Sequence, residues 1–284
     1  MIKNMILEEC KVCFRHCKID EGQYGFCGVR TCRDGAVVPE NYGWLTAIAL
    51  DPIEKKPLNR FYPGSRILSV GSYGCNLRCP FCQNSDISWA DEVEISKRES
   101  KYVSPEELTE IAQELKTKGN IGVAFTYNEP LISYEYMLDT AKLLKQKDLK
   151  VVMVSNGMAD TETVGELFQY VDAMNIDLKG FTDHYYQDLL KGNRQMVMDF
   201  IEEAVKHCHV ELTTLIIPGE NDSEEEMLEL SKWVSELGED IPLHISRFFP
   251  RFKMTDRDAT SVKWIYHLKD VAEQNLKYVF TGNC

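Results

Sequence analysis

Short apolar runs alternate with amphipathic stretches from about residue 66 onward. The runs have the length of buried strands and recur about every 25 to 40 residues, as in a parallel sheet whose strands are joined by helices. They occupy residues 66–70, 121–126, 150–155, 173–178, 210–217 and 242–248. The stretches between them predict helices from 104 onward and near 133–146, 161–169, 183–207 and 222–237. Six strand–helix units joined by right-handed crossovers predict an α/β fold.

The number of units decides between an open and a closed barrel. A complete eightfold barrel has about 250 residues and needs two more units, so the pattern predicts a partial (β/α)6 TIM-like barrel. Local signals agree with the predicted helices: Ser104 is a candidate N-cap, followed by Pro105 and by Glu107 as the acid of a capping box. Asp222 or Ser223 is expected to cap the 222–237 helix. Polar side chains at the carboxyl ends of these strands are expected to form the active site.

The first part of the chain differs from the rest. Residues 1–65 show turn signals and little periodicity, which predicts a small cysteine-rich appendage (1–65) packed against a barrel domain (66–284). Residues 1–74 carry a net charge of +2, whereas the remainder carries −15. A surface this acidic repels polyanions, which argues against non-specific nucleic-acid binding as the main task.

The composition is that of a globular protein, with 44% hydrophobic and 27% charged residues in 284. No stretch approaches the roughly 20 apolar residues of a membrane helix. The first residues turn acidic at Glu8 and Glu9 before a secretory segment could form. We therefore expect a cytoplasmic protein with no membrane partner.

Eight of the ten cysteines precede residue 83. In a reducing compartment such a cluster indicates metal binding or catalysis rather than disulfides. Cys75, Cys79 and Cys82 follow the first predicted barrel strand at x3 and x2 spacing. Three thiolates on one loop can hold three irons of a [4Fe–4S] cluster and leave the fourth iron open for a substrate. Three buried free thiols or a zinc loop are the alternatives.

A second group consists of Cys10, Cys13, Cys17 and Cys27. Four thiolates at this spacing can converge on one tetrahedral zinc ion and fold a segment that is too small for a core of its own. A second iron–sulfur cluster and a set of reduced, buried thiols are the competing interpretations, because thiolate spacing alone does not separate them. Cys32 is then a spare thiol or an alternate ligand.

The Cys75–Cys82 loop after a first barrel strand resembles the signature of the radical S-adenosylmethionine (SAM) superfamily. The resemblance implies that SAM binds the open iron and that an electron from the cluster cleaves it to methionine and a 5′-deoxyadenosyl radical, which abstracts a hydrogen atom. Within the superfamily the chain is most similar to the radical SAM protein of the AmmeMemoRadiSam system, a group related to pyruvate formate-lyase activating enzymes. That likeness is carried by residues 10–30, 52–58, 75–84, 125–130 and 244–248.

The same resemblance implies roles for side chains near the strand ends. Phe81 is expected beside the SAM adenine. Activases carry a Gly-Gly-Glu-Pro stretch that contacts the SAM amine, and here Glu129-Pro130 is preceded by Tyr127-Asn128 instead of two glycines. The implied SAM-binding residues are Phe81, Asn128, Glu129, Ser155, Asn156, Asp177, Lys179 and His244. For His244, a core position is an equally good interpretation.

Three functions follow as hypotheses. The first is a radical SAM oxidoreductase that resembles glycyl-radical activases and abstracts hydrogen from an unidentified protein or small molecule. The second is an iron–sulfur or zinc protein that binds partners or carries electrons without SAM chemistry, and the third is a methylating or sulfur-inserting radical enzyme. Lys55, Lys56 and Arg60 form a basic cluster with two interpretations, a solvated loop or a docking site for an acidic electron donor such as flavodoxin or ferredoxin.

Overall fold

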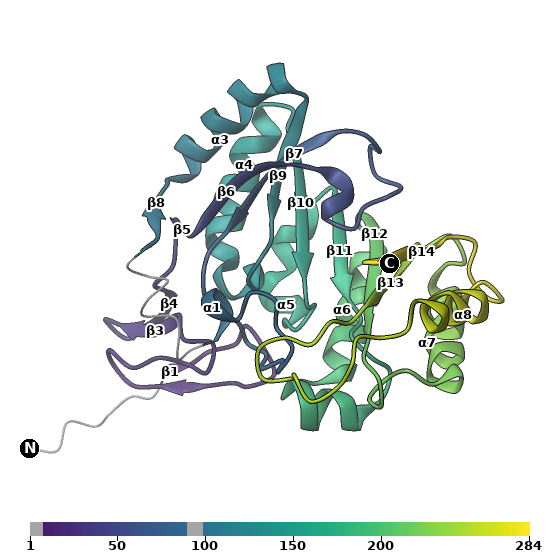
Figure 1. The fold of residues 1–284 in the computed structure, drawn as a ribbon. Helices are drawn as coiled ribbons and strands as arrows, with labels where there is room; N and C mark the ends of the chain where they lie inside the picture. The colour runs from purple at the N-terminus through teal and green to yellow at the C-terminus, as the bar shows by residue number, and fades with distance from the viewer. Residues whose placement is uncertain (1–7, 90–98) are drawn as a thin grey trace, which may run out of the picture.

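A single eight-stranded sheet organises the chain in the computed structural model, which describes residues 8–89 and 99–284 (Figure 1). The strand order is β14-β13-β12-β11-β10-β9-β7-β6, parallel from β7 to β14, with β6 antiparallel at one edge. The strands are β6 (Ala47–Pro52), β7 (Arg66–Gly71), β9 (Asn120–Phe125), β10 (Lys150–Ser155), β11 (Ala173–Asp177), β12 (His209–Ile216), β13 (Leu243–Arg247) and β14 (Val279–Gly282). The predicted α/β partial barrel is confirmed.

All six predicted strands form, and the sheet gains a strand at each edge. β14 follows a helix that the pattern did not indicate, α8 (Val262–Ala272). β6 lies within the segment 1–65 that was predicted as a separate appendage, yet it pairs with β7 from Ala47 opposite Gly71 to Pro52 opposite Arg66. Hydrogen bonding therefore places residues 47–52 with the barrel, and the appendage proper ends before them.

The connecting helices lie close to their predicted positions. They are α3 (Pro105–Glu114), α4 (Tyr134–Gln146), α5 (Thr161–Val164), α6 (Arg194–Ala204) and α7 (Glu224–Leu237). The Ser104 hydroxyl accepts the Glu107 amide at 3.2 Å, and Ser223 caps α7 in the same way. The predicted stretch 183–207 is broken, because Lys191 adopts a left-handed φ of 55° between the π-helical turn Tyr185–Leu190 and α6.

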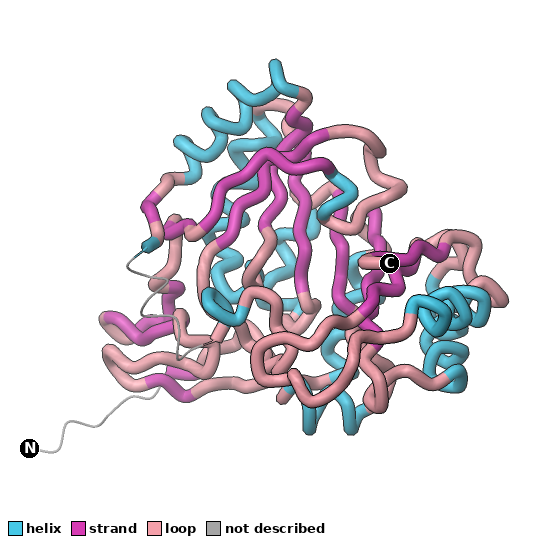
Figure 2. The backbone as a smooth tube through the Cα atoms, in the orientation of Figure 1, coloured by secondary structure: helices cyan, strands magenta, loops and turns pink. Residues whose placement is uncertain are grey.

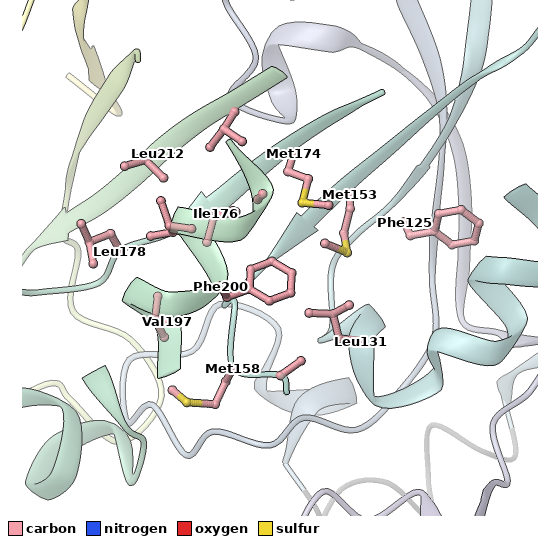
Figure 3. Close-up of a cluster of buried hydrophobic side chains, with 14 of the residues drawn as sticks. Phe125, Leu131, Met153, Met158, Met174, Ile176, Leu178, Val197, Phe200 and Leu212 are labelled. Atoms are coloured by element: carbon pink, nitrogen blue, oxygen red, sulfur yellow. The ribbon is translucent and has the colours of Figure 1, made fainter. Parts of the chain in front are cut away.

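One face of the sheet packs against helices (Figure 3). Met153, Met174 and Ile176 alternate along β10 and β11 with residues that face the barrel interior, and they pack with Phe200 of α6. All four side chains are 1% exposed or less. This layer fixes the strands whose carboxyl ends carry the candidate site.

The amino-terminal segment forms short hairpins at the edge of the molecule where β10 and β11 end (Figure 1). Its strands are β1 (Glu8–Glu9) with β2 (Lys18–Ile19) and β3 (Arg30–Arg33) with β4 (Ala36–Pro39). β5 (Trp44–Leu45) pairs with β8 (Lys101–Tyr102). Within the described residues, no helix combines the length and the apolar character that a membrane crossing requires.

The other end of the barrel is closed by the loop between β6 and β7. Ile53, Leu58 and Phe61 of this loop pack with Ile67 and Val152 from the barrel interior. The loop also binds a buried carboxylate: Glu211 of β12 accepts the amides of Asn59 at 3.0 Å and Arg60 at 2.7 Å. The loop therefore plugs the amino ends of the strands, opposite the cysteine loop.

Glu211 also pairs with two histidines, His209 at 3.0 Å and His244 at 2.6 Å. Burial opposes its negative charge, but the hydrogen bonds from both histidines and from the loop amides lower the pKa of Glu211 from 4.5 to about 2. A carboxylate with a lowered pKa stabilises the fold above its unfolded pKa, and that stability is lost as the pH falls from 4.5 towards 2.

We expect Glu211→Gln to lower the free energy of unfolding at pH 7 by about 3 kcal/mol, the scale set by this pKa shift. The variant should also lose less stability than the parent between pH 5 and pH 3, because it has no carboxylate to protonate. Urea unfolding across this pH range measures both effects. Glu229→Gln on the exposed face of α7 is the control and should follow the parent curve.

Candidate functional site

Loops from four neighbouring strands meet at the carboxyl edge of the sheet (Figure 2). The cysteine loop follows β7, Glu129 follows β9, Ser155 ends β10 and Asp177 ends β11. Because these strands are parallel and adjacent, their ends lie together, as predicted.

The three cysteines of the loop are free and at least partly buried. Burial raises the pKa of Cys79 to about 12, and it also raises the pKa of Cys75 and Cys82. The charge of Lys179 opposes this rise at Cys79 and Cys82. Two donors face the sulfur of Cys75, the Leu77 amide at 3.4 Å and Asn156 Nδ2 at 3.8 Å. These N–H groups and the nearby cation favour thiolates, the form that binds metal.

Two arginines hold the cysteine loop against the amino-terminal segment. Arg78 donates to the carbonyls of Cys75 and Leu77 at 2.8 Å and to the Phe26 carbonyl. Arg15 donates to the Asn76 carbonyl at 3.2 Å, and both guanidinium groups lie over the ring of Phe26. The contacts from Arg15 to Asn76 and from Arg78 to Phe26 were not predicted, because they join residues more than 50 positions apart and no local pattern marks them.

Glu129 is the buried acid of the site. Its Oε1 accepts from Ser155 Oγ at 2.7 Å and from the Leu131 amide at 3.0 Å, and its Oε2 accepts the Asn156 amide at 2.8 Å. Burial raises the pKa of Glu129 to about 7 in spite of these hydrogen bonds, and the charge of Asp177 adds to the rise. A cation placed beside Glu129 would therefore be strongly favoured.

Asp177 and Lys179 form an ion pair at 2.7 Å, and both side chains are less than one-third exposed. The Lys179 main chain is fixed on both sides, since its amide donates to Tyr186 Oη at 3.1 Å and its carbonyl accepts from Asn221 Nδ2 at 2.9 Å. Burial works against the ammonium charge, but Asp177 and Cys79 raise the pKa of Lys179. The pair thus links the cysteine loop electrostatically to the strand ends.

Tyr127, at the first of the two positions where the resemblance to activases led us to expect glycine, has a glycine-like backbone. Tyr127 has a φ of 74°, a conformation that glycine adopts without strain and other residues rarely adopt. Its hydroxyl donates to Asp51 at 2.9 Å inside the barrel. Asn128 accepts the Ser72 amide at 2.9 Å and donates to the carbonyls of Tyr73 and Gly74 at 3.2 Å. Asn128 therefore positions the start of the cysteine loop, rather than presenting a free amide to SAM.

The buried hydroxyl of Tyr185 has no hydrogen-bond partner in the described part of the chain. Tyr185 is 2% exposed, and the charge of Cys79 helps to raise the pKa of its hydroxyl, after burial as the main cause. In residues 8–89 and 99–284, no three side chains among His, Cys, Asp and Glu form a ready-made metal site. The thiols, the buried acid and the unpaired hydroxyl nevertheless fit an iron–sulfur cluster with a polar, cationic ligand beside it.

Two predicted features lie elsewhere. His244 is the second residue of β13 and pairs with Glu211 near the amino ends of the strands, so its position favours the core interpretation over SAM contact. The Lys55, Lys56 and Arg60 cluster belongs to the loop at that same end. Lys56 is 2% exposed and bound to Asp51 at 3.0 Å, so the cluster offers no continuous basic surface beside the cysteines.

Phe81 is 6% exposed and packs in the main hydrophobic cluster together with Cys79. Its predicted place beside the SAM adenine stays a prediction. Ser155 and Asn156 lie in the site through their hydrogen bonds to Glu129. Asn156 also donates to Asn76 Oδ1 at 3.0 Å, which ties β10 to the cysteine loop.

Comparison with known proteins agrees with this geometry. The chain is 40% identical over 277 residues to the uncharacterized protein MJ0808 of Methanocaldococcus jannaschii, covering 96% of this chain and 80% of that protein. It is 23% identical to pyruvate formate-lyase 1-activating enzyme of Escherichia coli over 182 residues, 62% of this chain and 71% of the enzyme. The solved structure of SuiB from Streptococcus suis has a TM-score of 0.58 at 15% identity.

The SuiB match covers 75% of this chain and about half of SuiB (48%), so it supports the fold alone. The model of the radical SAM superfamily matches residues 69–231, which include the cysteine loop and the carboxyl ends of β7, β9, β10, β11 and β12. Members of this superfamily bind a [4Fe–4S] cluster and SAM. The chain therefore belongs to the radical SAM superfamily.

Proposed function

We propose that Cys75, Cys79 and Cys82 hold the [4Fe–4S] cluster and that the protein cleaves SAM reductively to abstract hydrogen from its substrate, as an oxidoreductase that resembles glycyl-radical activases. When bound, the cluster supplies the electron that splits SAM into methionine and a 5′-deoxyadenosyl radical. The observation that carries the proposal is the meeting of three thiols with Glu129, Asn156 and the Asp177–Lys179 pair at one edge of the sheet.

The chain's own residues supply the binding of SAM. A carboxylate has about four lone-pair positions, and protein donors occupy three of those on Glu129. The remaining position suits an N–H of the SAM amine. Asp177 supplies a second negative charge that favours the sulfonium, and the buried Tyr185 hydroxyl is available to a polar group of the ligand.

We further propose that the chain belongs to the AmmeMemoRadiSam group and takes a protein or a small molecule as its substrate. The sequence motifs at residues 10–30, 52–58, 75–84, 125–130 and 244–248 support this group. We propose a cytoplasmic location because all ten cysteines are free thiols.

A flavodoxin- or ferredoxin-type protein is the proposed electron donor. The side chain of Lys253 is exposed, and its amide donates to the Pro80 carbonyl of the cysteine loop at 2.9 Å. This cation beside the loop supports docking of an acidic surface there.

The test is SAM cleavage. Protein reconstituted with iron and sulfide, and reduced by dithionite, should convert SAM to 5′-deoxyadenosine and methionine in equal amounts. Deuterium transferred from candidate substrates into 5′-deoxyadenosine would then identify the substrate. An intact cluster without any SAM cleavage would favour the alternative, an iron–sulfur protein that carries electrons without SAM chemistry.

A further inference from the structure

The amino-terminal segment contains a small cavity that the SAM site does not use. All four cysteines of the first group line it, Cys10, Cys13, Cys17 and Cys27, and its other walls include Arg15, Arg30 and Asn76. Cys32, the fifth cysteine of the segment, does not line it and faces Glu21 at 3.5 Å. The four cysteines that their spacing groups together therefore line one cavity, although within the described residues they are not already arranged as a metal site.

Arg30 gives the cavity an unpaired donor. The side chain is 5% exposed, and its terminal nitrogens are bound to Glu135 at 2.8 and 3.1 Å and to the carbonyls of Val37 and Ile132 at 3.2 Å. Its Nε, in contrast, is buried and has no hydrogen-bond partner in the described residues. An unmet buried N–H is costly, so an acceptor is expected next to it.

The charge of Arg30 indicates what that acceptor is. Arg30 lines the same cavity as Cys10 and Cys27, so its positive charge lies beside their sulfur atoms. Glu135 holds the guanidinium in place through two hydrogen bonds. A thiolate sulfur in the cavity would meet both the charge and the free N–H.

We propose that Cys10, Cys13, Cys17 and Cys27 bind one zinc ion as four thiolates, with Arg30 as a positioning residue that donates Nε–H to a ligand sulfur. Four thiolates and no open position are typical of a structural zinc site. Binding converts four thiols to thiolates and releases their protons to solvent, without any redox change.

The site lies directly against the loop of Cys75. A Cβ at Gly74 would lie 2.8 Å from the Cys27 carbonyl and 2.6 Å from Val29 Cγ1, so the two segments are in backbone contact. The Asp160 amide also donates to the Val12 carbonyl at 2.8 Å. Zinc would thus fix a segment that supports the cysteine loop. Loss of the zinc should lower the melting temperature of the protein, while the cluster of the SAM site remains.

Metal analysis of anaerobically prepared full-length protein tests the site. We expect about one zinc and about four irons per chain. Cys13→Ser and Cys27→Ser should each lose most of the zinc and keep the iron, whereas Cys32→Ser, in the same segment, should keep both. Cobalt in place of zinc should show the sulfur-to-cobalt charge-transfer bands of four thiolates, and these bands should be absent in Cys13→Ser. Arg30→Gln should release zinc to a chelator several-fold faster than the parent, and Arg33→Gln should not.

About eight irons and no zinc would overturn the proposal in favour of a second cluster. Retention of zinc in both ligand variants would also overturn it. If a variant fails to fold, alkylation of the unaltered protein decides: the four cysteines should react only after zinc is chelated, while the exposed Cys284 reacts in both states. Equal reaction of the four thiols with and without chelator would show that no zinc is held there.

Discussion

Replacement of Cys75, Cys79 or Cys82 by alanine is expected to abolish SAM cleavage. A methyl group cannot replace a thiolate ligand, and two protein thiolates would leave two irons of the cluster without a ligand. Each variant should lose most of the roughly four irons that a [4Fe–4S] cluster contributes, together with its visible absorbance and its reduced-state electron paramagnetic resonance signal. Iron analysis and the yield of 5′-deoxyadenosine measure the two losses.

Cys208→Ala is the matched control, because Cys208 is a partly buried thiol immediately before β12, remote in sequence from the loop. It should keep both the iron and the cleavage activity. The zinc expected in the amino-terminal segment should remain in all four variants, which separates loss of the cluster from unfolding. SAM cleavage that persists in any of the three loop variants would show that the cluster ligands have been assigned wrongly.

The repeat of the barrel could be predicted because its strands are buried on both faces and read as apolar runs. The two strands at the edges of the sheet, β6 and β14, could not be predicted in this way. β6 alternates little in burial and lies among turn signals, and β14 has only four residues of which one is buried. Hydrogen bonds to β7 and β13 position these two edge strands. The apolar pattern along one strand carries no information about the strand with which it pairs.

Residues at the carboxyl ends of strands could be placed because parallel neighbours end at one edge. Glu129, Ser155 and Asp177 were placed in this way. Applied strictly, this rule would have excluded His244 from the predicted SAM-binding residues. His244 lies near the start of the predicted strand 242–248, and therefore at the amino end of the barrel, opposite the site. There His244 Nε2 lies 2.6 Å from the carboxylate of Glu211.

Contacts between distant segments account for the rest of the site. Arg30 meets Glu135 across 105 positions, and Asn128 binds the 72–74 backbone across more than 50. Nothing in the local sequence of either residue marks its partner. The glycine-like φ of Tyr127 was equally hidden, because a tyrosine gives no signal for a left-handed backbone.

Removal of the carboxylates at the strand ends is expected to weaken SAM binding without loss of the cluster. Glu129→Ala and Asp177→Ala should each raise the SAM dissociation constant about 5- to 150-fold, or about 1–3 kcal/mol, the scale of a lost charge-assisted hydrogen bond. Calorimetry on cluster-loaded protein measures the change. Asp172→Asn is the control, since Asp172 precedes the same strand β11 at its amino end and pairs with Lys145 and Lys150 there.

The dependence on pH separates a direct role of Glu129 from a structural one. Burial raises the pKa of Glu129 to about 7, so below pH 7 the acid must first lose a proton to accept an N–H of the SAM amine. SAM affinity should therefore increase as the pH rises through 7. Glu129→Gln keeps the shape of the side chain but has no acid to titrate. In this variant, SAM affinity should depend on pH only through the protonation of the SAM amine itself.

Asp177→Asn should also change the dependence of SAM affinity on pH, but in a different way from Glu129→Gln. The charge of Asp177 helps to raise the pKa of Glu129, so its removal should move the midpoint of the SAM-binding curve to lower pH while affinity falls at every pH. A purely structural contribution of Asp177 would lower affinity without moving the midpoint. Unchanged SAM affinity in both alanine variants would instead mean that Tyr127 and Asn128 direct SAM to a different binding mode, in which the amine does not meet Glu129.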